Sequence, residues 1–348
     1  MDLNIVEQRP VRVGVVGCGV VADYGHIPAI DRCERAELVG FADPNQERRE
    51  KQAERYGKPG FESFEQMVEA VELDAVTIAT QPNIKLDMIR IAAEHGLHAF
   101  CEKPLTDDVE QAEELVRMMD DAGLFCAVAF VYRGQEVVQR MMQLVRDGAI
   151  GPLRVVRTVN LWDYHGLRDQ AIRGDRRRRA LRNLGTLDCG VHHYDLVRYM
   201  SGADYEEVNS VGTIVEAENI YPDHIMTNGR MTNDVIVSLE ESAVWGYTAE
   251  ERPRYQHSYT MIGENGLVHG SSTGIAHGQS ELYVVSGGEQ CTEMLDSSKA
   301  WDETYRQFYA TITGDPPAHA FVADAHDALI NMRVAREVIS QCQEGMQG

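Results

Sequence analysis

The sequence has few features of a disulfide-rich, membrane or nucleic-acid-binding protein. Its seven cysteines are scattered and contain no C-x-x-C pair, which argues against a disulfide framework or a structural zinc site. No apolar run approaches the length of a membrane span, and the N-terminal MDLNIVEQRP lacks the basic and apolar segments of a signal peptide. The net charge of −22 argues against a phosphate backbone or an anionic membrane as a partner. We therefore expect a cytoplasmic protein with reduced thiols.

Strand-like and helix-like segments alternate over the first part of the chain. The strand-like runs cover residues 11–17, 37–43, 74–80, 98–103 and 125–130, and helical stretches lie near 45–56, 83–95 and 106–122, with Asn45, Asn83 and Thr106 as N-caps. This alternation is typical of a parallel, doubly wound sheet. It predicts an α/β Rossmann domain.

The pattern changes after about residue 150. Long alternating strands are predicted at 153–160, 206–218, 233–251 and 255–263, and two long helices near 297–313 and 321–343. At 348 residues the chain is long enough for two domains. We predict an NAD(P)-binding Rossmann domain over residues 1–130. A substrate-binding and oligomerisation α+β domain with a large, mostly antiparallel sheet follows over 131–348.

The segment GVVGCGVVA (14–22) lies where the first strand ends and a helix begins. Gly17 allows a tight turn, and Gly19 allows a close approach of a pyrophosphate to backbone amides. An acid ends the second strand. That acid, Asp43, is placed to accept hydrogen bonds from the ribose of NAD and would repel the 2′-phosphate of NADP. We expect the dinucleotide to be bound by Gly17, Cys18, Gly19, Val20, Val21 and Asp43. NAD is favoured over NADP, although Arg48 and Arg49 lie nearby.

Two further segments carry groups suited to chemistry. Lys103 in CEKPLT (101–106) follows the fourth strand, and ligands bind at the carboxyl ends of strands in such sheets. In DCGVHHYD (188–195), Asp188, His192 and Asp195 fall at i, i+4 and i+7 on one face of a helix. A face with two acids and a histidine is compatible with catalysis, with zinc binding or with exposure to water.

Several motifs together resemble the glucose–fructose oxidoreductase / inositol dehydrogenase (Gfo/Idh/MocA) family. They are GVVGCGVVADYGHIPAI, TQPN (80–83), EKP (102–104), GLFCAVAFVYR (123–133), DGAIGPLRVV (147–156) and the D-x-x-x-H-x-x-D octet. The resemblance implies a Rossmann domain and an α+β domain whose broad sheet forms an oligomer interface, in a dimer or tetramer. It also adds Thr80, Asn83, Glu102 and Lys103 to the cofactor site.

The resemblance assigns the catalytic roles to Lys103, Asp188 and His192. Oxidation of a secondary alcohol needs a base for the hydroxyl proton, and histidine suits this task. Asp188 would orient the imidazole or bind a neighbouring hydroxyl, and Lys103 would stabilise the developing alkoxide. On this reading the octet is a proton relay and holds no metal. Substrate contacts are expected from Lys103, Tyr164, Asp188, His192 and Arg182.

The implied activity is an NAD-dependent dehydrogenase or reductase acting on a secondary hydroxyl of a sugar, cyclitol or sugar derivative. An alternative is NAD-assisted glycoside cleavage through transient oxidation at C3 followed by elimination, with His165 or Tyr164 as the additional base. A second alternative is a non-catalytic NAD sensor. The retained Lys103, Asp188 and His192 argue against a sensor.

An arginine-rich segment, RDQAIRGDRRRRALR (168–182), precedes the octet in an otherwise acidic chain. Arginine's planar fork suits carboxylate, phosphate or sulfonate groups, so one prediction is an acidic or phosphorylated sugar substrate. One or two of the following arginines would hold it: Arg173, Arg176, Arg177, Arg178, Arg179 and Arg182. An exposed loop or an oligomer contact explains the same composition.

Overall fold

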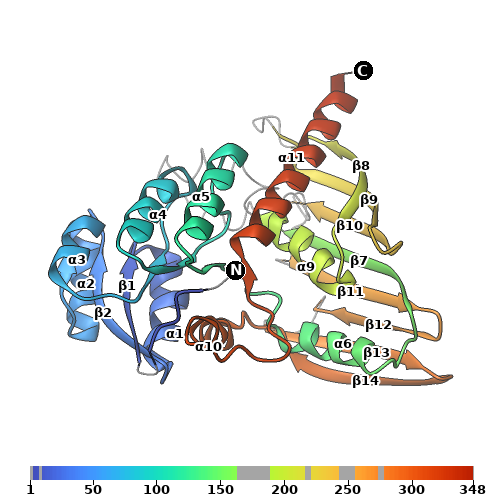
Figure 1. Cartoon of the computed structure of the whole chain (residues 1–348). Helices are drawn as coiled ribbons and strands as arrows, with labels where there is room; N and C mark the ends of the chain where they lie inside the picture. The colour runs from blue at the N-terminus through green and yellow to red at the C-terminus, as the bar shows by residue number, and fades with distance from the viewer. Residues whose placement is uncertain are drawn as a thin grey trace, which may run out of the picture. The chain divides into compact units, whose positions relative to one another are not determined.

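A computed structural model of the chain describes residues 3–7, 10–162, 189–215, 221–242, 255–272 and 278–347. The chain divides into two compact units (Figure 1). The first comprises residues 1–134 and 300–330, and the second comprises 135–299 and 331–348. The chain therefore returns to the first unit after completing most of the second. The assignment of cofactor binding to residues 1–130 and of substrate binding and oligomerisation to residues 131–348 stays a prediction.

The first unit is built on a seven-stranded sheet in the order β15-β6-β5-β4-β1-β2-β3. Its strands are β1 (Val11–Val16), β2 (Ala36–Ala42), β3 (Gly60–Phe61), β4 (Ala75–Ile78), β5 (His98–Cys101), β6 (Cys126–Val128) and β15 (Ala323–Asp324). The pairings among β1 to β6 are parallel, and β15 adds an antiparallel edge strand. β4 and β5 are buried along their whole length, as expected for strands covered on both faces. The predicted parallel, doubly wound sheet is confirmed.

Helices connect these strands. They are η1 (Ala22–His26), α1 (Ile27–Arg32), α2 (Gln46–Tyr56), α3 (Phe64–Ala70), η2 (Pro82–Ile84), α4 (Lys85–Glu94), α5 (Val109–Asp121) and α10 (Trp301–Ile312). Asn45 caps α2 by accepting a hydrogen bond from the Arg48 amide, as predicted.

Two predicted helix starts are wrong. Asn83 lies inside the short helix η2, so α4 begins only at Lys85. The Thr106 hydroxyl donates to the carbonyl of Asp108, and the Asp108 carboxylate then caps α5 by accepting from the Gln111 amide. In both places the predicted N-cap residue belongs to a local turn, and the α-helix begins two or three residues after it.

The second unit contains an eight-stranded sheet in the order β14-β13-β12-β11-β7-β10-β9-β8. Its strands are β7 (Leu153–Trp162), β8 (Tyr205–Thr213), β9 (His224–Met231), β10 (Ile236–Ser242), β11 (Tyr255–Gly263), β12 (Gly266–Ser271), β13 (Gln279–Ser286) and β14 (Glu289–Asp296). The sheet is mostly antiparallel, as predicted, and β7 pairs in parallel with β10. The sequence patterns did not identify β9, β12, β13 or β14, whose polar residues obscure the alternation.

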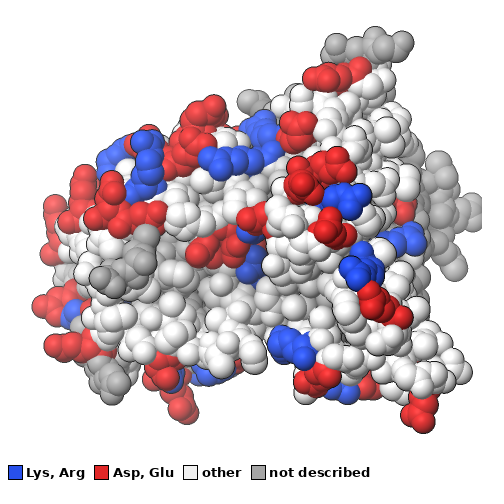
Figure 2. Space-filling model, turned by 45° about the vertical axis from the view of Figure 1, so that its right-hand side comes forward, with Lys and Arg blue, Asp and Glu red and all other residues white. Residues whose placement is uncertain are grey.

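Helices α6 (Glu136–Arg146) and α9 (Val191–Ser201) belong to the second unit, and α11 (Ala325–Gln347) begins in the first unit and continues into the second. α6 contacts β12 and β14, and α9 contacts β7 and β10. Within the described ranges, no helix is both long and apolar enough to cross a membrane. Acidic side chains are spread over the face drawn in Figure 2, with lysines and arginines between them.

Candidate active site

Four of the predicted cofactor residues follow four neighbouring strands of the first unit. Asp43 follows β2, Gly17 follows β1, Thr80 follows β4 and Glu102 follows β5, and these strands are adjacent in the order β5-β4-β1-β2. Backbone hydrogen bonds continue the pairing past the strand ends, from the Gly17 amide to the Ala42 carbonyl (2.8 Å) and from the Glu102 amide to the Ile78 carbonyl (2.9 Å). Parallel strands present their carboxyl ends at one edge, so the four residues share the edge at which such sheets bind ligands.

The loop after β1 has the backbone that a pyrophosphate requires. Gly17 has φ +91°, and a Cβ there would lie 2.7 Å from the Ala79 carbonyl oxygen. At Gly19 a Cβ would meet nothing within 4 Å, so the space beside this residue is open. The Gly19 carbonyl accepts the first helical hydrogen bond, from the Asp23 amide. The amides of Val20 and Val21 thus stand in the first turn, where N–H groups have no acceptor within the helix.

Asp43 ties this loop to the end of β2. Its Oδ2 accepts a hydrogen bond from the Cys18 amide at 2.7 Å, and its Oδ1 accepts one from the Asn45 amide at 2.8 Å. A carboxylate has about four acceptor positions, so further donors can bind it. Burial, and then the charge of Asp43, raise the pKa of the Cys18 thiol to about 12, so this cysteine stays protonated near neutrality.

Two arginines follow Asp43 on α2. Arg49 donates to the Asp43 main-chain carbonyl at 2.6 Å, which directs this guanidinium to the backbone. Arg48 is exposed. Arg49 therefore has a structural partner, and the site retains an acid at the position where NAD enzymes bind the ribose.

The segment after β4 carries two of the predicted cofactor residues, Thr80 and Asn83. The Thr80 hydroxyl is buried and forms no hydrogen bond within the part of the chain that the structure describes. Asn83 lies exposed in η2. A buried hydroxyl without a partner is costly, so Thr80 is suited to a hydrogen bond with a bound ligand.

A buried lysine that the sequence did not indicate holds the turn around Lys103. Lys85, at the start of α4, is completely buried, and its Nζ donates to the main-chain carbonyls of Glu102 and Pro104. These are the two residues on either side of Lys103. Lys103 is half-buried, and its peptide bond to Pro104 is cis. Lys85 had no recognisable sequence signal, because a lysine in the first turn of a helix is ordinarily solvated.

The octet lies at the start of α9 in the second unit, and Asp188 lies outside the described residues, as do Tyr164, His165 and the arginine-rich segment 168–182. His192 is 5% exposed. The second histidine, His193, packs edge-on against His257, with 5.7 Å between ring centroids. Burial, and then the His257 charge, place the pKa of His193 well below its usual range. His193 is therefore a neutral core residue.

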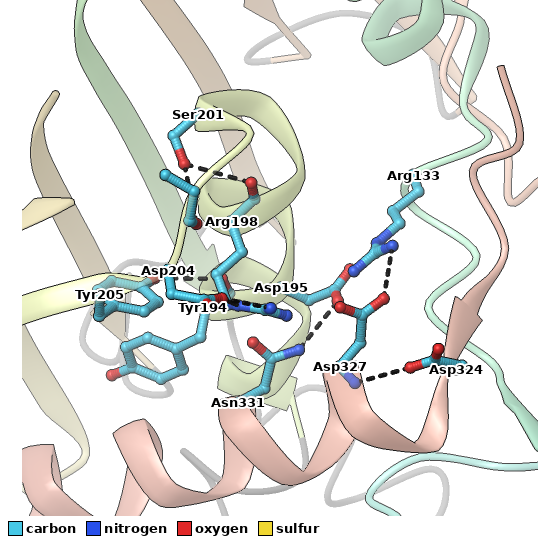
Figure 3. A network of polar contacts seen from close by, with 11 residues as sticks. Arg133, Tyr194, Asp195, Arg198, Ser201, Asp204, Tyr205, Asp324, Asp327 and Asn331 are labelled. Carbon is cyan, nitrogen blue, oxygen red and sulfur yellow. Dashed lines mark hydrogen bonds and ion pairs between the residues drawn. The ribbon is translucent and has the colours of Figure 1, made fainter. Parts of the chain in front are cut away.

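The last acid of the octet is also part of the core. Asp195 is completely buried, and the Asn331 side-chain amide on α11 donates to its Oδ1 at 2.9 Å (Figure 3). Tyr194 is buried as well, and its hydroxyl donates to Glu241 on β10 at 3.2 Å. Asp195, Tyr194 and His193 thus fix α9 within the second unit. Sequence reasoning missed Asn331 and Glu241, which pair with the octet only through the tertiary fold.

Two family descriptions match consecutive parts of the chain. Residues 11–130 match the oxidoreductase family with an NAD-binding Rossmann fold, GFO_IDH_MocA, and residues 138–269 match the GFO/IDH/MocA C-terminal domain. The two matches together include most of the chain. The first match includes strands β1 to β6, and the second includes β7 to β11 and most of β12.

Individual proteins are similar over part or all of the chain. A dTDP-3,4-didehydro-2,6-dideoxy-alpha-D-glucose 3-reductase of Actinomadura kijaniata is 28% identical over 60% of this chain and 61% of its own length. A scyllo-inositol 2-dehydrogenase (NAD(+)) of Bacillus subtilis is 30% identical over 60% of this chain and 59% of its own. The aligned part thus spans about 60% of these curated relatives. The structure of an Agrobacterium radiobacter oxidoreductase with NAD+, L-tartaric acid and magnesium has a TM-score of 0.81 at 16% identity, covering 97% of both chains.

Proposed function

Since the chain belongs to the Gfo/Idh/MocA oxidoreductase family, we propose that it is an NAD-dependent oxidoreductase for carbohydrates. It transfers hydride between nicotinamide and a secondary hydroxyl of a sugar, cyclitol or sugar derivative. The observation that carries this proposal is the edge formed by Asp43, the Gly17 loop, Thr80 and Glu102 at the carboxyl ends of four adjacent strands.

The residues of this edge fit a dinucleotide. The open space at Gly19 and the first-turn amides of Val20 and Val21 suit a pyrophosphate, and the Thr80 hydroxyl supplies an unused polar group. Asp43 accepts hydrogen bonds from the ribose hydroxyls of NAD, and its negative charge disfavours binding of the 2′-phosphate of NADP. When bound, the nicotinamide supplies the hydride acceptor or donor.

The acid–base roles are proposed for Lys103, Asp188 and His192. His192 accepts the proton of the substrate hydroxyl during oxidation and returns it during reduction. Lys103 stabilises the negative charge that develops on the reacting oxygen. Asp188 orients the imidazole or binds a neighbouring hydroxyl. Asn83 and Glu102 complete the proposed cofactor site.

The relatives offer two substrate classes, and we propose the anionic one. The A. kijaniata relative is named for a dTDP-sugar, which carries phosphates, and the B. subtilis relative is named for a neutral inositol. The arginine-rich segment 168–182 contains seven arginines and only two acids, which favours an anionic sugar. Tyr164 and Arg182 are the proposed substrate contacts from this part of the chain.

A homo-oligomer formed through the sheet of the second unit is part of the proposal. Large apolar side chains are exposed on its strands, among them Val211 on β8 (71% exposed), Met226 on β9 and Met294 on β14. Exposed apolar groups on a sheet are a common feature of subunit interfaces. Light scattering after gel filtration should give a dimer or tetramer, and a monomer at micromolar concentration would refute this part. We also place the protein in the cytoplasm.

The activity is tested with a panel of substrates and both cofactors. Matched neutral and anionic sugars, together with cyclitols, are incubated with NAD+ or NADP+, and NADH or NADPH is followed by absorbance. We expect net NADH formation with an anionic sugar and a KM that rises with salt, because screening weakens ionic attraction. Turnover of a glycoside without net NADH release would point to elimination instead. Equal efficiency on neutral sugars, with no salt effect, would remove the anionic assignment.

A further inference from the structure

His26, the last residue of η1, is completely buried and uses both ring nitrogens. Its Nε2 lies 3.1 Å from Oε1 of Glu102, and its Nδ1 lies 2.6 Å from the hydroxyl of Tyr305 on α10. The Tyr305 oxygen lies 3.1 Å from Oγ1 of Thr77 on β4. The indole of Trp301 packs edge-on against the imidazole, with 4.6 Å between ring centroids. The ring is therefore fixed by contacts with several separate segments of the first unit.

The chemistry of these groups sets the direction of one hydrogen bond. An ionised carboxylate only accepts, so Nε2 carries a proton and donates to Glu102. In the neutral ring Nδ1 accepts from Tyr305, and in the imidazolium it donates to Tyr305. The bond to Glu102 is the same in both states. Thr77, at the far end of this series of bonds, is completely buried within the sheet, so the bonds from His26 to Tyr305 and Thr77 hold the ring in place.

The surroundings of Glu102 favour its charged form. Burial by itself would raise the pKa of this carboxyl, but the hydrogen bond and charge of His26, with the charges of Lys103 and Lys85, lower it to about 2. The titratable groups around it are His26 on η1, Lys85 on α4, Tyr305 on α10, and Cys101 and Lys103 on its own segment. Burial places the pKa of Tyr305 well above its usual range, so this hydroxyl remains neutral.

From this arrangement we propose that His26 is a positioning residue for Lys103: its Nε2–H holds the Glu102 carboxylate in place and charged, directly next to the lysine. The inference rests on the proposed function, in which Lys103 stabilises the reacting oxygen. A fixed carboxylate favours the protonated ammonium, which is the form of lysine that stabilises an alkoxide. Lys85 holds the backbone of the same turn, and His26 holds its carboxylate.

Two substitutions separate the two hydrogen bonds of His26. A glutamine amide reaches about as far as Nε2, so His26→Gln keeps a donor for Glu102 and loses the contact to Tyr305. The shorter asparagine reaches about as far as Nδ1, so His26→Asn keeps the contact to Tyr305 and loses the donor for Glu102. We expect His26→Gln to retain kcat within about threefold, and His26→Asn to lose about tenfold or more at pH 6. The NAD+ affinity should change little in His26→Gln, which keeps Glu102 in place.

The pH profile distinguishes positioning from stability. In the wild type, log kcat should fall below its optimum with a slope of one, from protonation of the base. In His26→Asn the slope should approach two, because Glu102 then protonates in the same range. The control is His98→Asn, which alters another buried histidine with both ring nitrogens bonded, on β5. It should lower the melting temperature and leave the slope unchanged.

A second measurement needs no substrate. A carboxyl with a lowered pKa contributes stability above its unfolded pKa and loses it as the pH falls. His26→Gln should therefore melt higher than His26→Asn at pH 7, and the difference should narrow as the pH falls below about 4.5 and disappear only near pH 2. Equal slopes of one in both variants, or a melting difference independent of pH, would overturn the inference. A wild type inactive on the whole panel refutes the proposed function instead, and the melting comparison still decides whether His26 keeps Glu102 charged.

Discussion

Glu241 on β10 offers the sharpest test of the electrostatics in the second unit. Its side chain is 8% exposed, and Oε1 forms no hydrogen bond with any residue that the structure describes. The Tyr194 hydroxyl donates to Oε2, and a Cβ on Gly190 would stand 2.6 Å from Oε1. Burial raises the pKa of this carboxyl from 4.5 to about 8, and the Tyr194 hydrogen bond offsets part of the rise. Glu241 is thus protonated in the folded protein at neutral pH.

The raised pKa makes stability fall as the pH rises. Between pH 4.5 and 8 the unfolded chain releases this proton and the folded chain keeps it, so the unfolded state is favoured increasingly with pH. At about 1.4 kcal/mol per pH unit, the free energy of unfolding decreases by about 3 kcal/mol between pH 5 and pH 8 from this group alone. Glutamine resembles the protonated acid and does not titrate. Glu241→Gln should therefore gain about 3 kcal/mol relative to the wild type over the same interval.

The measurement is urea unfolding of the full chain at pH 5, 6, 7 and 8. Glu206→Gln is the matched control, because Glu206 is an exposed acid of the same sheet, on β8. Its curve should run parallel to the wild type. The reasoning is refuted if the difference between Glu241→Gln and the wild type stays constant with pH, since the carboxyl would then be ionised in the folded protein. The absolute offset of the variant is not decisive, because the added N–H group also needs an acceptor.

Three further predictions concern the proposed site and its support. His192→Ala should lower kcat by roughly 10²- to 10⁴-fold with little change in NAD affinity; near-normal turnover would exclude His192 as the base. Asp43→Ala should weaken NAD binding and relax discrimination against NADP, as measured by titration of both cofactors; a wild type that prefers NADP would contradict the assignment. Asn331→Ala should reduce the free energy of unfolding by about 1–3 kcal/mol, because a donor to the buried Asp195 is lost, and unchanged urea unfolding would argue against this contact.

The Rossmann part of the fold was predictable because its signals lie close together in the sequence. The apolar run of β1, the glycines after it and Asp43 at the end of β2 lie within a short stretch, and each has a local physical requirement. Gly17 needs a positive φ, and its position after a strand announces the turn. The strands of the second unit were only partly predictable. β14 reads EQCTEMLD and is largely exposed, so it lacks the alternation by which half-buried strands are identified.

The polar contacts that support the site were not predictable from local pattern, because their partners are distant in the sequence. Asn331 and Asp195 are separated by 136 residues, and His26 and Tyr305 by 279. Figure 3 shows the first of these pairs joining α9 to α11. The spacing within the octet placed Asp195 on the same helical face as His192. It could not predict which residues elsewhere in the chain would pack against each turn of that face. The buried asparagine decides that Asp195 is structural.

The burial of the charged Lys85 side chain was likewise not predictable from the sequence. A lysine in the first turn of a helix is expected to be solvated, and a buried ammonium without partners is strongly unfavourable. In this fold the main-chain carbonyls of Glu102 and Pro104 replace water for Lys85, so its burial is compatible with its charge. The sequence motif points to Lys103, whose catalytic role is proposed, whereas the residues that hold its turn are side chains that only the fold brings there. Substitution of such supports should change the properties of Lys103 without removing any group of the motif.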